Sequence, residues 1–272
     1  MSKFDTFHQY PSRGLSSARS VLLTIWPTLN RFHDDLVLVG GLAVDCLTKP
    51  EHQRFPGAVT MDVDLGISLA SESGLYGGIM IDLKGLGFQK DVRTNNRVYL
   101  DVEGMRLYLD FLTELKIGTS GSVMISDIVA DVVLGIDRAL ESRRFVELSG
   151  TDIWGAQQTC NIAVSDIGPL LVLKINAFGG PTGRRHPKDA YDVLLAVTTF
   201  IDGPEEAIRL FHEEANQNNS GYENAVTCLK HDFVDPDQDA PIRAAHFLAV
   251  SKDEQMSVRE EVATVGRFLL GM

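Results

Sequence analysis

Two aspartates two positions apart, Asp62 and Asp64, are the residues whose type and spacing point most directly to chemistry. They lie in the sequence TMDVDLGI (60–67), where apolar and polar residues alternate as in a half-buried β-strand. An extended chain places both carboxylates on one face, about 7 Å apart. That face is either simply solvated or holds a cation. Aspartate is disfavoured in strands and like charges on one face repel each other, which favours a functional reason.

A glycine pair, Gly40 and Gly41, follows the apolar run LVLV (36–39) and precedes LAVDCL (42–47). The run predicts a buried strand and the following segment predicts a short helix. Glycines at such a junction allow a positive φ and let backbone N–H groups approach a phosphate at the start of the helix. A turn that merely requires glycine is the alternative interpretation.

A third carboxylate, Asp110, lies in the alternating segment RLYLDFL (106–112). This segment is predicted to pair with VYLDVEG (98–104) as a hairpin that turns at Glu103-Gly104. Three oxygen ligands could hold one or two Mg²⁺ ions against the phosphates of a nucleotide.

Charged residues in the second half form another group of candidates. Lys174 lies in an apolar helical stretch, from which a lysine side chain can also extend to solvent. Asp189 and Asp192 are three residues apart on a predicted helix, where they could equally form a solvated face. The nearby basic residues could contact nucleotide or RNA phosphates or belong to a mobile loop; they are Arg184, Arg185 and Lys188.

The order of predicted elements indicates an α+β protein with a mixed sheet and flanking helices, followed by a C-terminal helical bundle. We expect two domains, 1–164 and 165–272, because helical segments replace strands after residue 164. Further strands are predicted at 144–150 and 158–164, and helices at 17–32, 74–86, 166–180 and 186–200. Trp26 and Trp154 are predicted to lie in the core.

Composition excludes several classes of protein. The chain has 272 residues, 44% of them hydrophobic and 23% charged, as in folded globular proteins. Its net charge of −12 argues against bulk attraction to nucleic acid. Three dispersed cysteines form neither a disulfide framework nor a zinc site. No signal peptide or membrane-spanning run is apparent, so we expect a cytoplasmic protein without a membrane partner.

The ordered segments VGGLAV, TMDVDLGI and LDFL together resemble the strand, Gly-Gly turn, Asp-x-Asp and third-carboxylate elements of the nucleotidyltransferase superfamily. LLVLKINAF and RRHPKDAYDVLLA resemble the lysine helix and the following acidic helix of AbiEii-type toxins from bacterial toxin–antitoxin systems. The resemblance covers about residues 35 to 200. One departure is Gly41, which occupies a position where the wider superfamily usually has serine.

The resemblance implies roles for individual residues. Gly40 and Gly41 would cradle a triphosphate, while Asp62 and Asp64 would bind Mg²⁺. Asp110 would bind a second metal ion or activate an acceptor hydroxyl. In the second half, Lys174 would neutralise phosphate charge, and Asp189 would lie beside it at the mouth of the cleft, with Asp192 as a further candidate there.

The implied activity is Mg²⁺-dependent transfer of a nucleoside monophosphate from a nucleoside triphosphate to a macromolecule. A tRNA 3′ end or a protein hydroxyl would be the acceptor, and the protein would be the toxin of a system with a cognate antitoxin. Two alternatives stay open. A small cationic acceptor such as an aminoglycoside would suit the acidic composition, and a homologue without catalysis would bind a nucleotide or protein only.

Overall fold

The computed structural model describes residues 4–49, 54–68, 78–91, 97–114, 121–248 and 251–272. By their internal contacts these residues form two compact units. The sheet unit comprises Ser12–Cys46 and Thr60–Asp166, and the helical unit comprises Met1–Pro11, Leu47–Val59 and Ile167–Met272. The chain therefore passes between the units more than once.

The sheet unit contains a mixed nine-stranded sheet with the order β3-β4-β5-β2-β1-β9-β8, to which β7 and β6 are added beside β5. The strands are β1 (Leu36–Val39), β2 (Asp62–Ile67), β3 (Gln89–Lys90), β4 (Arg97–Val102), β5 (Met105–Thr113), β6 (Ser122–Ile125), β7 (Ile128–Val132), β8 (Arg143–Thr151) and β9 (Gln157–Ser165). β2 pairs in parallel with β5, and β1 pairs in parallel with β9. Most other neighbours are antiparallel, so the predicted mixed sheet is confirmed.

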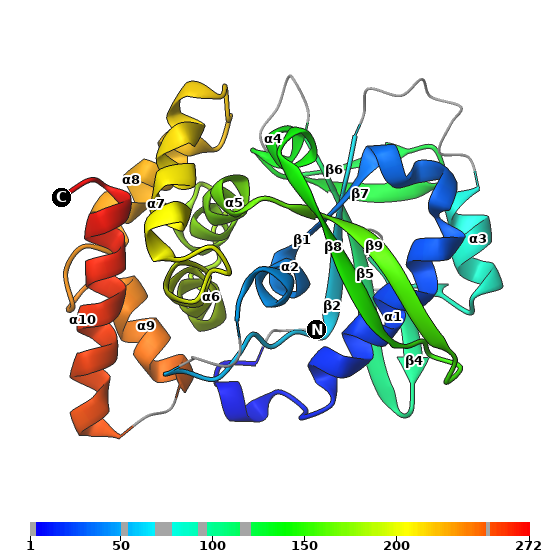
Figure 1. The fold of residues 1–272 in the computed structure, drawn as a ribbon, viewed down its shortest axis with the longest axis horizontal. Coiled ribbons are helices and arrows are strands. Elements are labelled where there is room, and N and C mark those ends of the chain that lie inside the picture. Colours follow the sequence, from blue (N-terminus) through cyan, green and yellow to red (C-terminus); the bar gives the residue numbers. More distant parts are fainter. Residues whose placement is uncertain (1–3, 50–53, 69–77, 92–96, 115–120, 249–250) are drawn as a thin grey trace. The chain divides into compact units, whose positions relative to one another are not determined.

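Helices flank this sheet. They are α1 (Gly14–Thr28), α2 (Gly40–Leu47), α3 (Ile79–Gly85) and α4 (Ile136–Glu141). α1 packs against β8 and β9 (Figure 1), and α4 packs against β2. All four residues of β1 are buried, as expected for a central strand with a continuous apolar sequence.

The hairpin of β4 and β5 turns at Glu103 and Gly104, as predicted from the sequence. Both residues have positive φ, 48° and 79°, which is the backbone of a type I′ two-residue turn. Trp26 is buried as expected. The prediction for Trp154 was wrong: it lies between β8 and β9 with 64% of its surface exposed.

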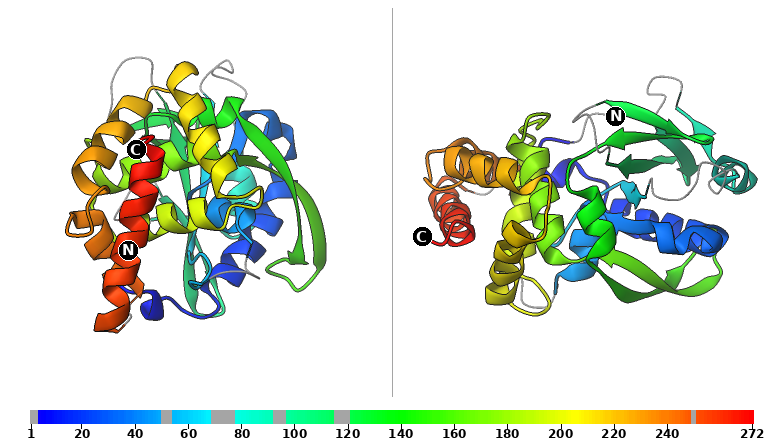
Figure 2. Two further views of the ribbon diagram at one scale, coloured as in Figure 1. Left: turned by 60° about the vertical axis from the view of Figure 1, so that its left-hand side comes forward. Right: turned by 90° about the horizontal axis from the view of Figure 1, so that it is seen from above.

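The helical unit contains α5 (Ile167–Gly179), α6 (Pro187–Thr198), α7 (Pro204–Glu213), α8 (Tyr222–Asp232), α9 (Asp239–Leu248) and α10 (Lys252–Leu269). Its most buried helices are α5 and α6, which pack against each other. α9 and α10 lie side by side (Figure 2), and both also contact α6. The predicted C-terminal helical bundle is thus confirmed.

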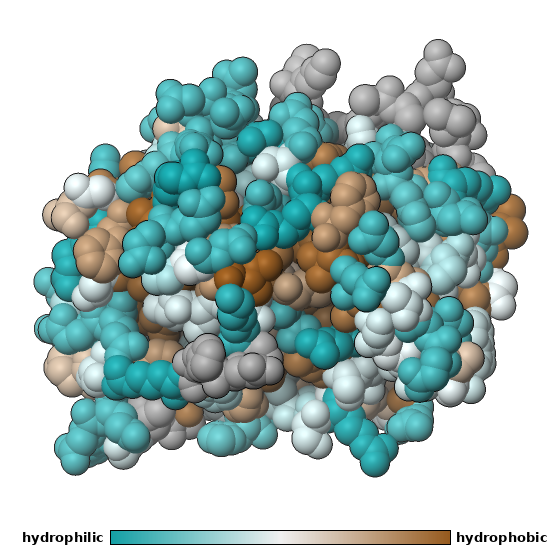
Figure 3. Space-filling view, in the orientation of Figure 1, coloured by the Kyte–Doolittle hydropathy of each residue, from teal (hydrophilic) through white to brown (hydrophobic). Residues whose placement is uncertain are grey.

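Hydrophilic residues cover much of the face shown in Figure 3, interspersed with smaller apolar areas. Among the described residues, no helix has both the length and the apolar composition needed to cross a membrane.

Candidate active site

Three carboxylates share one face of the sheet where β2 and β5 run parallel. Asp64 of β2 is paired in register with Asp110 of β5, and Asp62 lies two residues earlier on β2. Residues paired across a sheet point to the same face, as do residues two positions apart on one strand. The register therefore brings together the three aspartates that the sequence predicted as site residues.

The glycine pair lies directly beside Asp64. Val39, the last residue of β1, is paired with Asp64, and α2 begins at the next residue, Gly40. Gly40 has a φ of 73°, and a Cβ atom there would lie 1.8 Å from Oδ2 of Asp64. Glycine is thus required at position 40 both by the backbone and by the approach of the carboxylate. The helix was predicted to begin at residue 42, but Gly40 and Gly41 already belong to its first turn.

Arg97 of β4 is a member of this cluster that the sequence analysis did not identify. Its Nε and Nη2 atoms donate hydrogen bonds to the two oxygens of Asp110, at 2.7 and 2.6 Å. Nη2 also lies 3.3 Å from Oδ1 of Asp62. The guanidinium carbon lies 4.2 Å from the centre of the Tyr108 ring, so the group is held by two carboxylates and an aromatic face.

Burial and charge shift the protonation of this cluster. Burial, together with the carboxylates of Asp64 and Asp62, raises the pKa of Asp110 to about 7, although Arg97 acts in the opposite direction. Burial opposes the charge on Arg97, but its hydrogen bond and ion pairs with the carboxylates raise its pKa above the usual value. Three carboxylates with one guanidinium form an acidic site that is suited to a further cation.

The fit of Mg²⁺ can be judged from the donors present. Asp62, Asp64 and Asp110 offer the oxygen donors that Mg²⁺ prefers, and Arg97 already places a positive charge on two of them. Within the described ranges, no three His, Cys, Asp or Glu side chains are arranged to hold a metal ion as they stand. The donor chemistry fits Mg²⁺, whereas the present side-chain arrangement favours Arg97.

A second polar cluster is buried in the helical unit. Lys174 of α5 and Lys188 of α6 each place Nζ 2.6 Å from Oδ2 of Asp192. The exposed fraction of these three side chains is at most 6%. Burial alone would raise the pKa of Asp192, but the two lysines lower it below its usual value. Lys174 is therefore fixed by an ion pair and does not extend to solvent.

Asp189 is also completely buried, so the interpretation of α6 as a helix with a solvated acidic face was wrong. Its two oxygens accept hydrogen bonds from Nε and Nη2 of Arg184, at 2.7 and 3.0 Å. The physical reason is that residues 187 to 197 are all buried, so α6 has no solvated face on which a carboxylate could lie.

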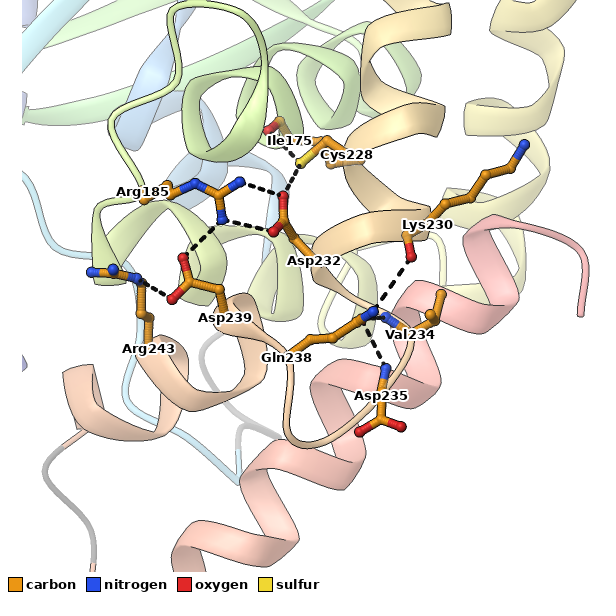
Figure 4. A network of polar contacts seen from close by, with 10 residues as sticks. All are labelled: Ile175, Arg185, Cys228, Lys230, Asp232, Val234, Asp235, Gln238, Asp239 and Arg243. Carbon is orange, nitrogen blue, oxygen red and sulfur yellow. Dashed lines mark hydrogen bonds and ion pairs between the residues drawn. The ribbon is translucent and has the colours of Figure 1, made fainter.

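Arg185 is held within the helical unit, as Figure 4 shows. Its guanidinium donates to both oxygens of Asp232, at 2.7 and 3.1 Å, and to Asp239 at 2.9 Å. Asp239 in turn accepts a hydrogen bond from Arg243. Arg184 and Arg185 thus have carboxylate partners in this structure, and their predicted contact with nucleotide phosphates stays a prediction. So does the predicted cooperation of Lys174 and Asp189 with the aspartates of the sheet unit.

Comparison with protein-family models and with curated proteins gives no match for this chain. Among solved structures, the CD-NTase CdnG of Bradyrhizobium diazoefficiens in complex with GTP is similar over 94% of this chain and 90% of that chain. The sequence identity is 11% and the TM-score is 0.29. At that score the likeness assigns no role to any residue of this chain.

Proposed function

We propose that this protein is a nucleotidyltransferase that moves a nucleoside monophosphate from a nucleoside triphosphate to an acceptor hydroxyl. The observation that supports the proposal best is the in-register pair of Asp64 and Asp110, with Asp62 on the same face and Gly40 packed against Asp64. Acidic oxygen donors beside a glycine-initiated helix combine a place for a cation with a place for phosphate.

In this proposal the acceptor hydroxyl attacks the α-phosphorus in line with the bond to the bridging oxygen. That bond breaks, pyrophosphate leaves, and the hydroxyl proton passes to solvent. Bound Mg²⁺ supplies neutralisation of phosphate charge. Asp62, Asp64 and Asp110 would hold the ion, and the backbone N–H groups of Gly40 and Gly41 would orient the phosphates. Positioning and charge stabilisation account for most of the rate in such reactions, so no protein nucleophile is needed.

The finer assignments rest on the resemblance to AbiEii-type toxins. They comprise a tRNA 3′ end or protein hydroxyl as acceptor, a cognate antitoxin, and a phosphate contact from Lys174 beside Asp189. The phosphate contacts proposed for Arg184 and Arg185 rest instead on the positive charge of these neighbouring residues. A small cationic acceptor is a second candidate, which the net charge of −12 favours because an acidic surface attracts cations.

The test is transfer of label from each of four α-³²P nucleoside triphosphates, with Mg²⁺, to total tRNA, to the protein itself or to an aminoglycoside. We expect transfer by the native chain and a loss of at least about a hundredfold in the Asp62→Ala/Asp64→Ala variant, since the charge stabilisation is removed. Asp101→Ala is the matched control, because Asp101 is an exposed aspartate on the same sheet and should leave transfer unchanged.

The outcomes separate the candidates. The labelled acceptor identifies its class, whether RNA, protein or small cation. Triphosphate binding that depends on Asp62 and Asp64 but yields no transfer to any acceptor would instead support the binding-only alternative. Equal transfer by the native chain and the double variant would exclude these aspartates from the chemistry.

A further inference from the structure

Arg97 places a permanent positive charge on the carboxylates that the proposed function assigns to a metal ion. It binds Asp110 through two parallel hydrogen bonds and reaches Asp62 across the β5 strand. Only 16% of its side chain is exposed, with 17% for Asp110 and 22% for Asp62. Bidentate arginine–carboxylate pairs are among the stronger hydrogen-bonded pairs in proteins, and partial burial reduces screening by salt.

We propose that Arg97 is an exchangeable internal counter-ion: it neutralises Asp110 and Asp62 in the metal-free protein and leaves Asp110 when a divalent cation binds there. The proposal rests on the proposed function insofar as it takes these aspartates as metal ligands. It adds Arg97 to the site, and it states that metal binding and the ion pair of Arg97 with Asp110 oppose each other.

The reason for exchange is competition for the same oxygens. Both oxygens of Asp110 accept hydrogen bonds from Arg97, at 2.7 and 2.6 Å. Mg²⁺ requires carboxylate oxygens at about 2.0–2.1 Å in near-octahedral geometry, which leaves little tolerance for a guanidinium on the same carboxylate. A divalent ion and a guanidinium a few ångströms apart in a partly buried site also repel each other strongly.

A purely structural role for Arg97 is the competing explanation, and the same hairpin contains a pair with which to compare it. Arg106 binds both oxygens of Asp101, at 2.9 and 3.0 Å, and lies over Tyr99 at 3.8 Å. That pair joins β4 to β5 near the turn and is far more exposed, at 42% and 53%.

The Arg97 pair differs from it by burial and by the added contact with Asp62 on a third strand. A clamp between β4 and β5 requires only Asp110. The contact with a carboxylate of β2, beside Asp64, is the observation that points to a role in the site.

A divalent ion must displace Arg97 from Asp110 in order to bind, so the presence of Arg97 weakens metal binding. Bound metal weakens the Arg97–Asp110 ion pair to the same extent, because both cations compete for one set of carboxylates. Couplings of this kind usually change affinity by about 5- to 150-fold. Removal of the guanidinium should therefore strengthen metal binding, whereas loss of a merely structural residue would leave it unchanged or weaken it.

The experiment measures Mn²⁺ binding to the full chain by the electron paramagnetic resonance signal of the free ion. Mn²⁺ is the probe because it accepts the same oxygen ligands as Mg²⁺. We expect Arg97→Gln to bind Mn²⁺ about tenfold more tightly than the native protein. Arg106→Gln should match the native affinity, and Asp62→Asn/Asp64→Asn should lose binding.

A second measurement uses the native protein and so does not depend on the folding of a variant. The Nε–H signal of Arg97, followed by NMR, should change as Mg²⁺ is added, while that of Arg106 should not. Mn²⁺ affinity equal in the native and Arg97→Gln proteins, or an Arg97 signal that is unchanged while Mg²⁺ binds, would overturn the exchange but leave the metal site intact. Absence of Mn²⁺ binding from both the native and Arg97→Gln proteins would overturn the metal site of the proposed function as well.

Discussion

Gly40 shows how one residue connects the backbone to the site. Its φ of 73° is unfavourable for any residue with a Cβ, and the space a Cβ would occupy is taken by the carboxylate of Asp64. The sequence predicted a glycine-dependent junction at this point. It could not distinguish a glycine that admits a phosphate from one that admits Asp64, because only the register of β1 with β2 places Asp64 beside it.

The two costs at position 40 can be separated by substitution. Gly40→Ala should destabilise the sheet unit by about 1–2 kcal/mol from the backbone conformation, plus about 1–3 kcal/mol from the clash with Asp64. Gly104→Ala is the matched control, since Gly104 has a φ of 79° but nothing within 4 Å of an added Cβ. Urea denaturation of both variants measures the difference, and equal destabilisation would show that Asp64 moves aside without cost.

The β4–β5 hairpin shows what sequence reasoning could have found at the level of elements. A two-residue turn at Glu103-Gly104 fixes every pair along the hairpin, including Arg97 opposite Asp110. The hairpin was predicted with its first strand beginning at Val98, and extending that strand by one residue would have placed Arg97 opposite Asp110. The contact of Arg97 with Asp62 could not be derived in this way, because it depends on β2 pairing with β5 and those strands are far apart in the sequence.

Helix α6 shows where sequence reasoning fails. Its bounds and the position of Pro187 in its first turn follow from local signals. Its burial depends on contacts with α5, α9 and α10, which no local pattern records. A solvated face therefore stayed open as one interpretation of Asp189 and Asp192, whereas each carboxylate has a basic partner inside the helical unit.

Asp192 links this helix to the stability of its unit. Asp192→Asn should lower the free energy of unfolding by about 3–5 kcal/mol at pH 7, because it removes the buried carboxylate that Lys174 and Lys188 share. The pKa of Asp192 is lower in the folded than in the unfolded state, so its stabilisation is complete above about pH 4 and is lost as pH falls further.

Denaturation of the native and Asp192→Asn proteins at several pH values tests this expectation. The difference between them should shrink at acid pH. Arg209→Gln provides a control, since Arg209 forms exposed ion pairs with Glu206 and Glu213 on α7 and should have little effect. A difference that stays constant down to pH 3 would show that Asp192 does not stabilise the fold through its charge.

At the scale of the whole molecule, the helical unit is assembled from separate parts of the chain. Lys49 donates a backbone hydrogen bond to Thr199, and Leu47 accepts one from Ile201. The N-terminal segment contributes Phe7 and Tyr10, whose rings contact Phe247 edge to face at 6.1 and 6.0 Å. Sequence periodicity predicted the helices of this unit but not these attachments, because each joins residues more than a hundred positions apart.

The N-terminal attachment should therefore stabilise α9 in particular. Aromatic pairs contribute about 0.5–1.5 kcal/mol each beyond the area they bury, so Phe7→Ala/Tyr10→Ala should lower the stability of the helical unit by at least about 1 kcal/mol. Hydrogen exchange should accelerate more at the amides of α9, which contains Phe247, than at those of α7. Within the part of the chain that the structure describes, no aromatic pair joins α7 to the N-terminal segment. Phe268→Ala, at an aromatic residue of α10 that is 50% exposed, controls for the loss of a ring. Unchanged exchange in α9 would mean that residues 4–11 lie on the helical unit without stabilising it.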